Sequence, residues 1–422
     1  AWVGLAQIRG ELFMTGAIDA QRYINDAGVA VQRALELDPR DAGALAEQAR
    51  VMAADGRAGL AEESFRTALE IEPHNSDVYD NYGEWLRMRG RLVEARRMLE
   101  AGLEYDPLSP HLLFQLGRVE MYLGNPERNI EIGKKLIEID PSVVYGYVAL
   151  LQANIWRGRF DDAWPWYVKT LAADSDDYET WAHIALFFDD FGAPEYADRY
   201  MDRAMALDAD APVVVKCWTM ILQNRGRDDE ALALATQMLD AGIDNRWESD
   251  RILLRVLRDA ALDSGDLEAV LERYRQKVPA LFSANPIVTD ANVNKAADLA
   301  LLLQAAGDTA AAERLVANAL DWYQRSQTPG VYGYIHGLVK AELQAVAGDG
   351  DGAMATLQEA VDNGYRWQWQ WALANRNFDG IRKRPAFDLL LARLRADMAA
   401  QRENLDQVPD QGEFDLRGAV PK

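Results

Sequence analysis

The sequence predicts an all-α fold, a solenoid of about ten antiparallel helix pairs. Glycines recur at a fixed step of 34 residues, at Gly56, Gly90, Gly124, Gly158, Gly192 and Gly226. Two other series share this step: the prolines Pro39, Pro73, Pro107 and Pro141, and the alanines Ala27, Ala61, Ala95, Ala163, Ala197 and Ala231, with Asn129 filling the one gap. Self-similarity at such a period indicates stacked supersecondary units rather than a chain that closes on one core.

The three series mark the parts of one repeating helix pair. A helix often ends with a residue in the left-handed region, which glycine enters without a Cβ penalty, so each glycine predicts a stop and a tight turn. The alanine five residues later lies in the second helix, where a small side chain lets two helices approach closely. The proline ends that second helix because it cannot continue the hydrogen-bond ladder. Small residues also recur in the first helix, at Ala49, Gly83, Gly117, Ala185 and Thr219.

This set of positions resembles the tetratricopeptide repeat, a 34-residue helix–turn–helix. One repeat shows the pattern well, with Tyr79, Tyr82-Gly83, Leu86, Ala95, Leu99, Gly102 and Pro107. The resemblance implies a right-handed superhelix in which the first helix of every repeat lines a concave wall. Such a wall is suited to an extended peptide or a partner helix.

The spacing also predicts how the chain is divided. After Gly226 the glycines Gly265, Gly307 and Gly348 are separated by longer steps, so the later helix pairs are expected to be longer and less regular. The predicted parts are a longer first repeat over 1–41, six regular repeats over 42–245, irregular repeats over 246–364, an aromatic cap over 365–400 and a polar tail over 401–422.

The aromatic cap carries a second resemblance. Its residues include the run Tyr365-Arg366-Trp367-Gln368-Trp369-Gln370-Trp371, followed by Asn377-Phe378-Asp379-Gly380. This ending is similar to the last segment of repeat regions in bacterial membrane-anchored regulators of the winged-helix and adenylate-cyclase types. Because Trp367, Trp369 and Trp371 alternate, they cannot all face one side of a helix, and we expect a bent or non-helical cap.

Composition disfavours several classes of partner. The chain has 45 basic and 67 acidic residues, a net charge of −22. A polyanion repels phosphate backbones and anionic membrane surfaces, so we expect no nucleic acid and no direct membrane insertion; a protein or peptide of basic character is favoured instead. The single cysteine, Cys217, allows no intrachain disulfide. We expect a soluble protein of the bacterial cytoplasm or periplasm, with the choice between them and the oligomeric state left open.

The sequence predicts no enzyme, no cofactor and no metal site. The four histidines fall in different repeats without a second ligand at metal-binding spacing: His74, His111, His183 and His336. The stretch Gly348–Gly352 lacks the glycine and the glutamate of a calcium loop and coincides with a predicted turn. No serine or cysteine stands in a nucleophile motif, so no catalytic residue is assigned.

Candidate binding residues follow from the repeat register that the resemblance implies. The positions that face the concave wall are Asp77, Asp80, Asn81, Glu84, Arg87, His111, Phe114, Arg118, Met121, Tyr145 and Gln152, and Glu179, Leu186, Asp189, Lys216 and Gln223 continue the same wall. Asp80 and Glu84 are expected to be exposed on one helix face. Asn81 matches one asparagine of the clamp that grips chaperone tails, but the other clamp positions read Ala46, Arg50, His111 and Gln115, which disfavours that activity.

Two functions are compatible with these observations. The first is a non-enzymatic scaffold or adaptor that binds a protein or peptide in the concave groove. The alternative is the sensory or regulatory repeat region of a larger bacterial membrane-anchored transcriptional or cyclase regulator, which the resemblance of the aromatic cap implies.

Overall fold

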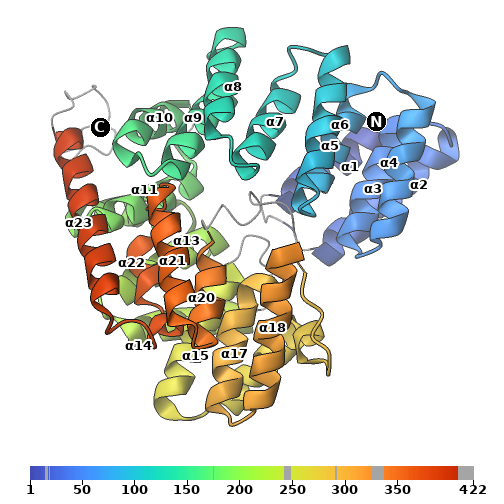
Figure 1. Cartoon of the computed structure of the whole chain (residues 1–422). Helices are drawn as coiled ribbons and strands as arrows, with labels where there is room; N and C mark the ends of the chain where they lie inside the picture. The colour runs from blue at the N-terminus through green and yellow to red at the C-terminus, as the bar shows by residue number, and fades with distance from the viewer. Residues whose placement is uncertain are drawn as a thin grey trace. The chain divides into compact units, whose positions relative to one another are not determined.

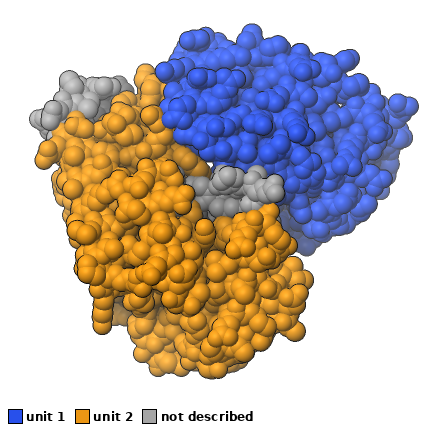
Figure 2. Space-filling model, in the orientation of Figure 1, with its two compact units in different colours: residues 1–149 blue, residues 150–422 orange. Residues whose placement is uncertain are grey.

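The computed structural model describes residues 1–14, 18, 20–173, 175–241, 249–289, 292–325 and 337–406 (Figure 1). Over these residues every regular element is a helix, so the predicted all-α solenoid of helix pairs is confirmed. The polar tail falls largely outside this range, as does His336. The chain forms two compact units, residues 1–149 and residues 150–422 (Figure 2).

Unit 1 consists of four helix pairs and the start of a fifth. Its helices are α1 (Trp2–Met14), α2 (Ala20–Leu37), α3 (Ala42–Ala54), α4 (Ala58–Ile71), α5 (Ser76–Met88), α6 (Leu92–Tyr105), α7 (Pro110–Tyr122), α8 (Pro126–Ile139) and the first residues of α9 (Tyr145–Trp156).

Unit 2 continues the pairs and ends in a more irregular segment. After the rest of α9, its elements are α10 (Phe160–Ala173), α11 (Tyr178–Asp190), α12 (Pro194–Asp208), α13 (Pro212–Asn224), α14 (Asp228–Asp240), α15 (Ser249–Ser264), α16 (Glu268–Lys277), η1 (Pro279–Phe282), η2 (Val293–Lys295), α17 (Ala296–Ala305), α18 (Thr309–Arg325), α20 (Leu338–Val346), α21 (Gly350–Asp362), α22 (Trp369–Ala374), η3 (Arg376–Phe378) and α23 (Pro385–Asp406).

The glycine series forms the turns inside the helix pairs. From Gly56 (φ 73°) to Gly226 (φ 66°), all six glycines are left-handed, and the later Gly265, Gly307 and Gly348 share this conformation. A side chain there would add strain, because L-residues rarely adopt positive φ. The recurring turn is therefore encoded directly by these glycines.

The alanine series lies where paired helices touch. Ala61, for example, is fully buried, as are the other alanines of the series. Asn129 is also fully buried, and its Nδ2 donates to the Ala149 carbonyl at 3.1 Å. Gly117 of the partner helix accommodates this larger side chain, since a Cβ on Gly117 would lie 2.2 Å from Asn129 Oδ1. The one exception to the alanine series is thus matched by a glycine across the interface.

A further 34-residue series begins the first helices. The side chains of Asp41, Asn75 and Ser109 each accept a hydrogen bond from a backbone N–H in the first turn of α3, α5 and α7, and Asp177 does the same for α11. Each side chain satisfies donors that the helix itself cannot pair, so it fixes the residue at which the helix starts.

The C-terminal segment of unit 2 returns to the first repeats of that unit. Helix α23 lies against α10 and α21, and Gln401 Nε2 donates to the Gly158 carbonyl at 2.8 Å. The turns at Gly158 and Gly364 also meet backbone to backbone, because a Cβ on Gly158 would lie 2.4 Å from the Gly364 oxygen. The helix pairs of unit 2 are therefore closed on themselves rather than left open at the C-terminal end.

The cap bends as the alternating tryptophans predict. Gln368 is the one non-glycine residue with positive φ (57°) among those described, and it turns the chain immediately before α22. Trp369 and Trp371 both follow this bend within α22 and are 5% and 4% exposed.

Candidate functional site

The predicted binding residues of unit 1 lie on the first helices of consecutive repeats. Their exposure varies: Asp77 and His111 are exposed; Asp80, Asn81, Glu84, Phe114, Arg118 and Tyr145 are partly buried; Arg87 and Met121 are buried. Asn81 donates its Nδ2 hydrogen bond to the Asp77 carbonyl one turn earlier, at 2.9 Å. Its amide is thus engaged on its own helix.

An aromatic strip joins α7 to α9. The Tyr145 hydroxyl lies 3.0 Å from His111 Nε2, and the two rings meet edge to face with centroids 4.9 Å apart. Phe114 stacks on Tyr145 at 4.9 Å, and the Arg118 guanidinium lies 5.8 Å from the Phe114 ring centroid. Residues 111 and 145 occupy the same position of successive repeats, so the 34-residue register places these rings side by side. Such a strip offers apolar area and polar edges together.

The acidic part of the wall is centred on Asp80 of α5. Its side chain is only 21% exposed, its Oδ1 is buried without a hydrogen-bond partner, and its Oδ2 lies 4.0 Å from His111 Nδ1. Burial, reinforced by the charges of Glu84 and Asp77, raises the pKa of Asp80 to about 7. The expectation that Asp80 and Glu84 are freely exposed is therefore wrong, because Glu84 is also only 21% exposed.

The basic part of the wall is centred on Arg87, at the end of α5. Its side chain is 6% exposed, and its Nη2 lies 3.7 Å from Glu84 Oε1, which is beyond hydrogen-bonding distance. Both Nε and Nη2 are buried and make no hydrogen bond. Burial and the nearby charge of Arg118 lower the pKa of Arg87 to about 10. Arg87 is thus a buried cation whose hydrogen-bonding capacity is not fully used.

Two residues of α3 extend this wall and were not among the predicted site residues. Glu47 is 1% exposed, and its Oε1 lies 3.2 Å from Arg50 Nη1. Burial raises the pKa of Glu47, although Arg50 opposes the shift. Gly10 of α1 makes room for the guanidinium, because a Cβ there would lie 2.8 Å from Arg50 Nη2. Arg50 lies 34 residues before Glu84. The repeat register that predicts Glu84 on the wall therefore predicts Arg50 there as well.

The wall predicted to continue into unit 2 is covered by the C-terminal segment. Leu186, Asp189 and Lys216 are buried. Gln370 donates to the Asp189 carbonyl at 2.7 Å, and the Trp371 indole donates to Gln223 Oε1 at 2.7 Å. The expectation that these residues line an open surface is therefore wrong, because they are buried or bonded to the C-terminal segment.

Neighbouring bonds reinforce this closure. The backbone N–H of Gln368 donates to Asp190 Oδ2 at 2.8 Å, and the Trp369 indole donates to the Asp190 carbonyl at 3.2 Å. Glu179 stays exposed. Gln152, the last predicted binding residue, belongs to unit 2 and has a buried Oε1 without a hydrogen-bond partner.

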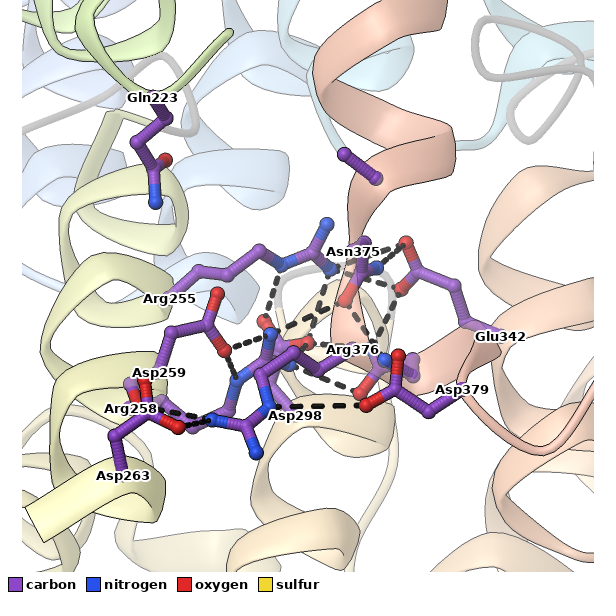
Figure 3. A network of polar contacts seen from close by, with 12 residues as sticks. Gln223, Arg255, Arg258, Asp259, Asp263, Asp298, Glu342, Asn375, Arg376 and Asp379 are labelled. Atoms are coloured by element: carbon purple, nitrogen blue, oxygen red, sulfur yellow. Dashed lines mark hydrogen bonds and ion pairs between the residues drawn. The ribbon is translucent and has the colours of Figure 1, made fainter. Parts of the chain in front are cut away.

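A buried polar network fixes the cap to α15, α17 and α20 (Figure 3). Arg255 donates through Nε and Nη2 to Asp298 at 3.1 and 2.9 Å, and its Nη2 also reaches Glu342 Oε2 at 2.9 Å. Arg258 Nη1 donates to Asp298 Oδ1 at 2.6 Å, and Asn377 Nδ2 donates to the same oxygen at 2.6 Å.

Two arginines and two acids form the fully buried part of this network. Arg255, Arg258, Asp298 and Glu342 are all within 2% of complete burial. The two arginines hold the pKa of Asp298 low, at about 2, against the effect of its burial. Its polar groups bond to one another across four segments, which is the arrangement of a structural lock rather than a binding site.

The described residues contain neither a metal-binding cluster nor a membrane-spanning helix. No group of three or more histidine, cysteine, aspartate or glutamate side chains there could hold a metal ion. Nor does that part of the chain contain a helix both long and apolar enough to cross a membrane.

Comparisons with known proteins agree with the repeat architecture. Residues 52–114 match the family model described as tetratricopeptide repeat. The chain is 34% identical over 132 residues to the type IV pilus assembly protein PilF of Pseudomonas aeruginosa, which is 30% of this chain and 52% of that protein. It is 20% identical over 157 residues to protein bimA of Emericella nidulans, which is 37% of this chain and 20% of that protein. The chain therefore spans about half the length of PilF and less of bimA.

Solved structures give similar matches. A tetratricopeptide repeat protein from Parabacteroides merdae aligns with 60% of this chain and 98% of its own, at a TM-score of 0.47 and 14% identity. The structure of Pseudomonas aeruginosa PilF aligns with 49% of this chain and 91% of its own, at a TM-score of 0.38 and 21% identity.

Proposed function

Since this chain is built from tetratricopeptide repeats, we propose that it is a non-enzymatic scaffold or adaptor that binds a protein or peptide along the concave wall of unit 1. The observation that carries the proposal is the aromatic strip of His111, Phe114 and Tyr145, flanked by the incompletely paired Asp80 and Arg87. Aromatic side chains beside charged groups are typical of surfaces that hold partners.

The contrast between the two units supports this assignment. In unit 2 the corresponding wall positions contact the C-terminal cap, as the bonds to Asp189 and Gln223 show. In unit 1 the wall positions Asp80 and Arg87 make no bond of this kind to a covering segment, and both retain buried polar atoms without a hydrogen-bond partner. Unpaired buried polar atoms are costly, so a ligand that pairs them gains affinity.

The chemistry of the wall favours binding over catalysis. His111 is the one imidazole of the wall in unit 1, and its neighbours are an aromatic hydroxyl and a largely buried carboxylate. The Tyr145 hydroxyl is engaged by His111 Nε2 at 3.0 Å, and the proposed binding role needs no cofactor. The overall charge of −22 favours a partner of basic character over nucleic acid.

An alternative is that the chain is the regulatory repeat region of a larger membrane-anchored regulator. The bent aromatic cap, whose sequence resembles that of such regulators, is the feature that favours it. The size and membrane association of the native polypeptide distinguish the two functions. A native chain that carries a DNA-binding or cyclase domain would favour the alternative.

The binding proposal is tested with a library of twelve-residue peptides displayed on phage, selected on the immobilised full chain. We expect selected peptides to bind the wild type and to lose about tenfold or more in affinity to the Phe114→Ala variant, because aromatic anchors dominate such surfaces. Tyr105→Ala is the control, since Tyr105 is an exposed aromatic residue at the end of the second helix α6. Equal losses in both variants, or none in either, would contradict a binding site on the concave wall.

A further inference from the structure

The guanidinium of Arg87 leaves one of its hydrogen-bonding edges empty. The side chain is 6% exposed, yet Nε and Nη2 have no hydrogen-bond partner. These two nitrogens form the side of the guanidinium that can bind both oxygens of one carboxylate at once. A buried arginine with this side empty is unusual, because buried polar groups are normally paired.

Other arginines of this chain show what that edge binds. Arg91 uses Nε and Nη2 to hold both oxygens of Glu94 at 2.7 and 2.6 Å. Arg227 holds Glu230 in the same way, at 2.7 Å for both bonds. The buried Arg255 holds Asp298 with the same two atoms. In each case the occupant is a carboxylate, which Arg87 lacks.

The surroundings of Arg87 add a second cation. Arg118 of the next repeat adds the repulsion of a second cation, and its Nη1 donates to Gln115 Oε1 at 3.5 Å. Glu84 is the nearest carboxylate to Arg87, at 3.7 Å, and is too far to form a hydrogen bond. Tyr122 also contacts Arg87, with its ring centroid 5.8 Å from the guanidinium carbon. Arg87 thus has a cation–π contact and one distant carboxylate, but no hydrogen bond on its Nε and Nη2 edge.

We propose that Arg87 and Arg118 form a binding site for an acidic side chain, an aspartate or glutamate of the segment that occupies the concave wall. This inference rests on the proposed function and specifies one feature of the partner. The ligand carboxylate takes the Nε and Nη2 edge of Arg87, displaces Glu84, and is also attracted by Arg118. The aromatic strip of Phe114 and Tyr145 on the adjacent helices receives neighbouring apolar groups of the same segment.

A side-chain carboxylate fits better than the end of a polypeptide. The predicted wall of unit 1 has residues on both sides of α5, Arg50 on α3 and Tyr145 on α9. A segment that follows this wall passes Arg87 in its interior and not at its terminus. The same segment can carry basic residues at other positions, because Asp77 and Asp80 on the earlier turns of α5 would attract them.

The test uses the displayed peptides described above, in which the peptide's C-terminus is fused and carries no free carboxylate. We expect selected peptides to share an Asp or Glu. A synthetic peptide with an amidated C-terminus then binds the wild-type chain about 10 to 100 times more tightly than its Glu→Gln or Asp→Asn counterpart, the range expected for a charge-assisted pair.

Variants of the chain locate the effect. In Arg87→Met the two peptides should bind equally, and Arg118→Gln should reduce their ratio. Glu84→Gln should strengthen binding of the acidic peptide a few fold, because it removes the competing carboxylate. Arg128→Gln on the second helix α8 is the matched control, since its exposed arginine pairs with Glu131, and it should change nothing. Thermal unfolding of Arg87→Met at or above the wild-type temperature establishes that the variant is folded.

The outcomes separate the two proposals. Peptides that bind the wall without any dependence on a carboxylate overturn the acidic site and leave the proposed function standing. Recovery of binding by a Gln peptide with a free C-terminus would assign the ligand to a chain end and overturn the side-chain proposal. Failure to select any binding peptide would contradict the proposed function, and the acidic site with it.

Discussion

The raised pKa of Asp80 predicts that one neutral substitution stabilises unit 1 in a pH-dependent way. We expect Asp80→Asn to make the repeats around α5 more stable at pH 8 and to have little effect at pH 4. The carboxylate is largely buried, with Glu84 and Asp77 on its own helix adding repulsion and Arg50 of α3 only partly compensating. On the neighbouring helix α7, His111 Nδ1 lies 4.0 Å from Asp80 Oδ2. Asparagine has nearly the same shape as protonated aspartate but cannot ionise.

The sign and size of the stability change follow from the pKa of Asp80 in the unfolded and in the folded chain. The pKa of Asp80 rises from 3.8 to about 7 on folding, so between these values the folded chain holds a proton that the unfolded chain has released. Stability therefore falls as the pH rises through this window, by about 1.4 kcal/mol per unit, and levels off above pH 7. The full penalty is about 4 kcal/mol, and it is an upper bound on what Asp80→Asn recovers at pH 8.

Hydrogen–deuterium exchange of the full chain measures the stability of the helices around Asp80 separately from the rest of the chain. Peptides from α5 and α7 should exchange more slowly in Asp80→Asn than in the wild type at pH 8, by up to about a thousandfold, and at similar rates at pH 4. Glu100→Gln provides the control, because it removes one acidic charge from an exposed position of α6. If Asp80→Asn exchanged faster than the wild type at pH 8, the carboxylate would be ionised and engaged, and the reasoning would be refuted.

Three further predictions concern packing. Gly117→Ala should cost about 1–3 kcal/mol of unfolding free energy alone and almost nothing in an Asn129→Ala background, because the 2.2 Å conflict is then removed; equal costs in both backgrounds would show that the contact is not limiting. Ala61→Leu should lower the melting temperature more than Ala58→Leu, since only Ala61 is fully buried, and equal temperatures would contradict the register. Asp298→Asn should cost about 3–5 kcal/mol by leaving two buried arginines under-compensated, and unchanged exchange of the cap peptides would contradict its role as a lock.

The local features of the fold could be predicted from the sequence because each depends on nearby residues. Positive φ at Gly56 and burial of Ala61 are properties of a single turn and a single helix pair, and the 34-residue step repeats them. The register also placed His111 and Tyr145 on one surface, where they are in contact. It could not predict that Asp80 would be largely buried, because exposure depends on which side chains of the neighbouring helices lie over it.

The closure of unit 2 could not be predicted, because it joins residues far apart in the sequence. The bond from Gln401 to the Gly158 carbonyl spans 243 residues, and no periodic pattern encodes such a pairing. The buried network had one weak signal. Asp298 is the one charged residue of the largely apolar helix α17, and a lone charge in such a helix needs a buried partner. The identity of that partner, Arg255, depends on the tertiary fold.

The first helices of the two units differ in what contacts them, and this difference indicates which chemical group could bind the wall of unit 1. In unit 2 the first helices α11 and α13 are covered by a bent segment that supplies indole and amide donors to Asp190 and Gln223. That segment is held in place by a separate network of buried charges. In unit 1 the free hydrogen-bond donors belong to the wall, because Nε and Nη2 of Arg87 have no acceptor. We therefore expect the proposed partner of unit 1 to bring an acceptor to this edge, and a carboxylate is the acceptor that an arginine edge binds most strongly.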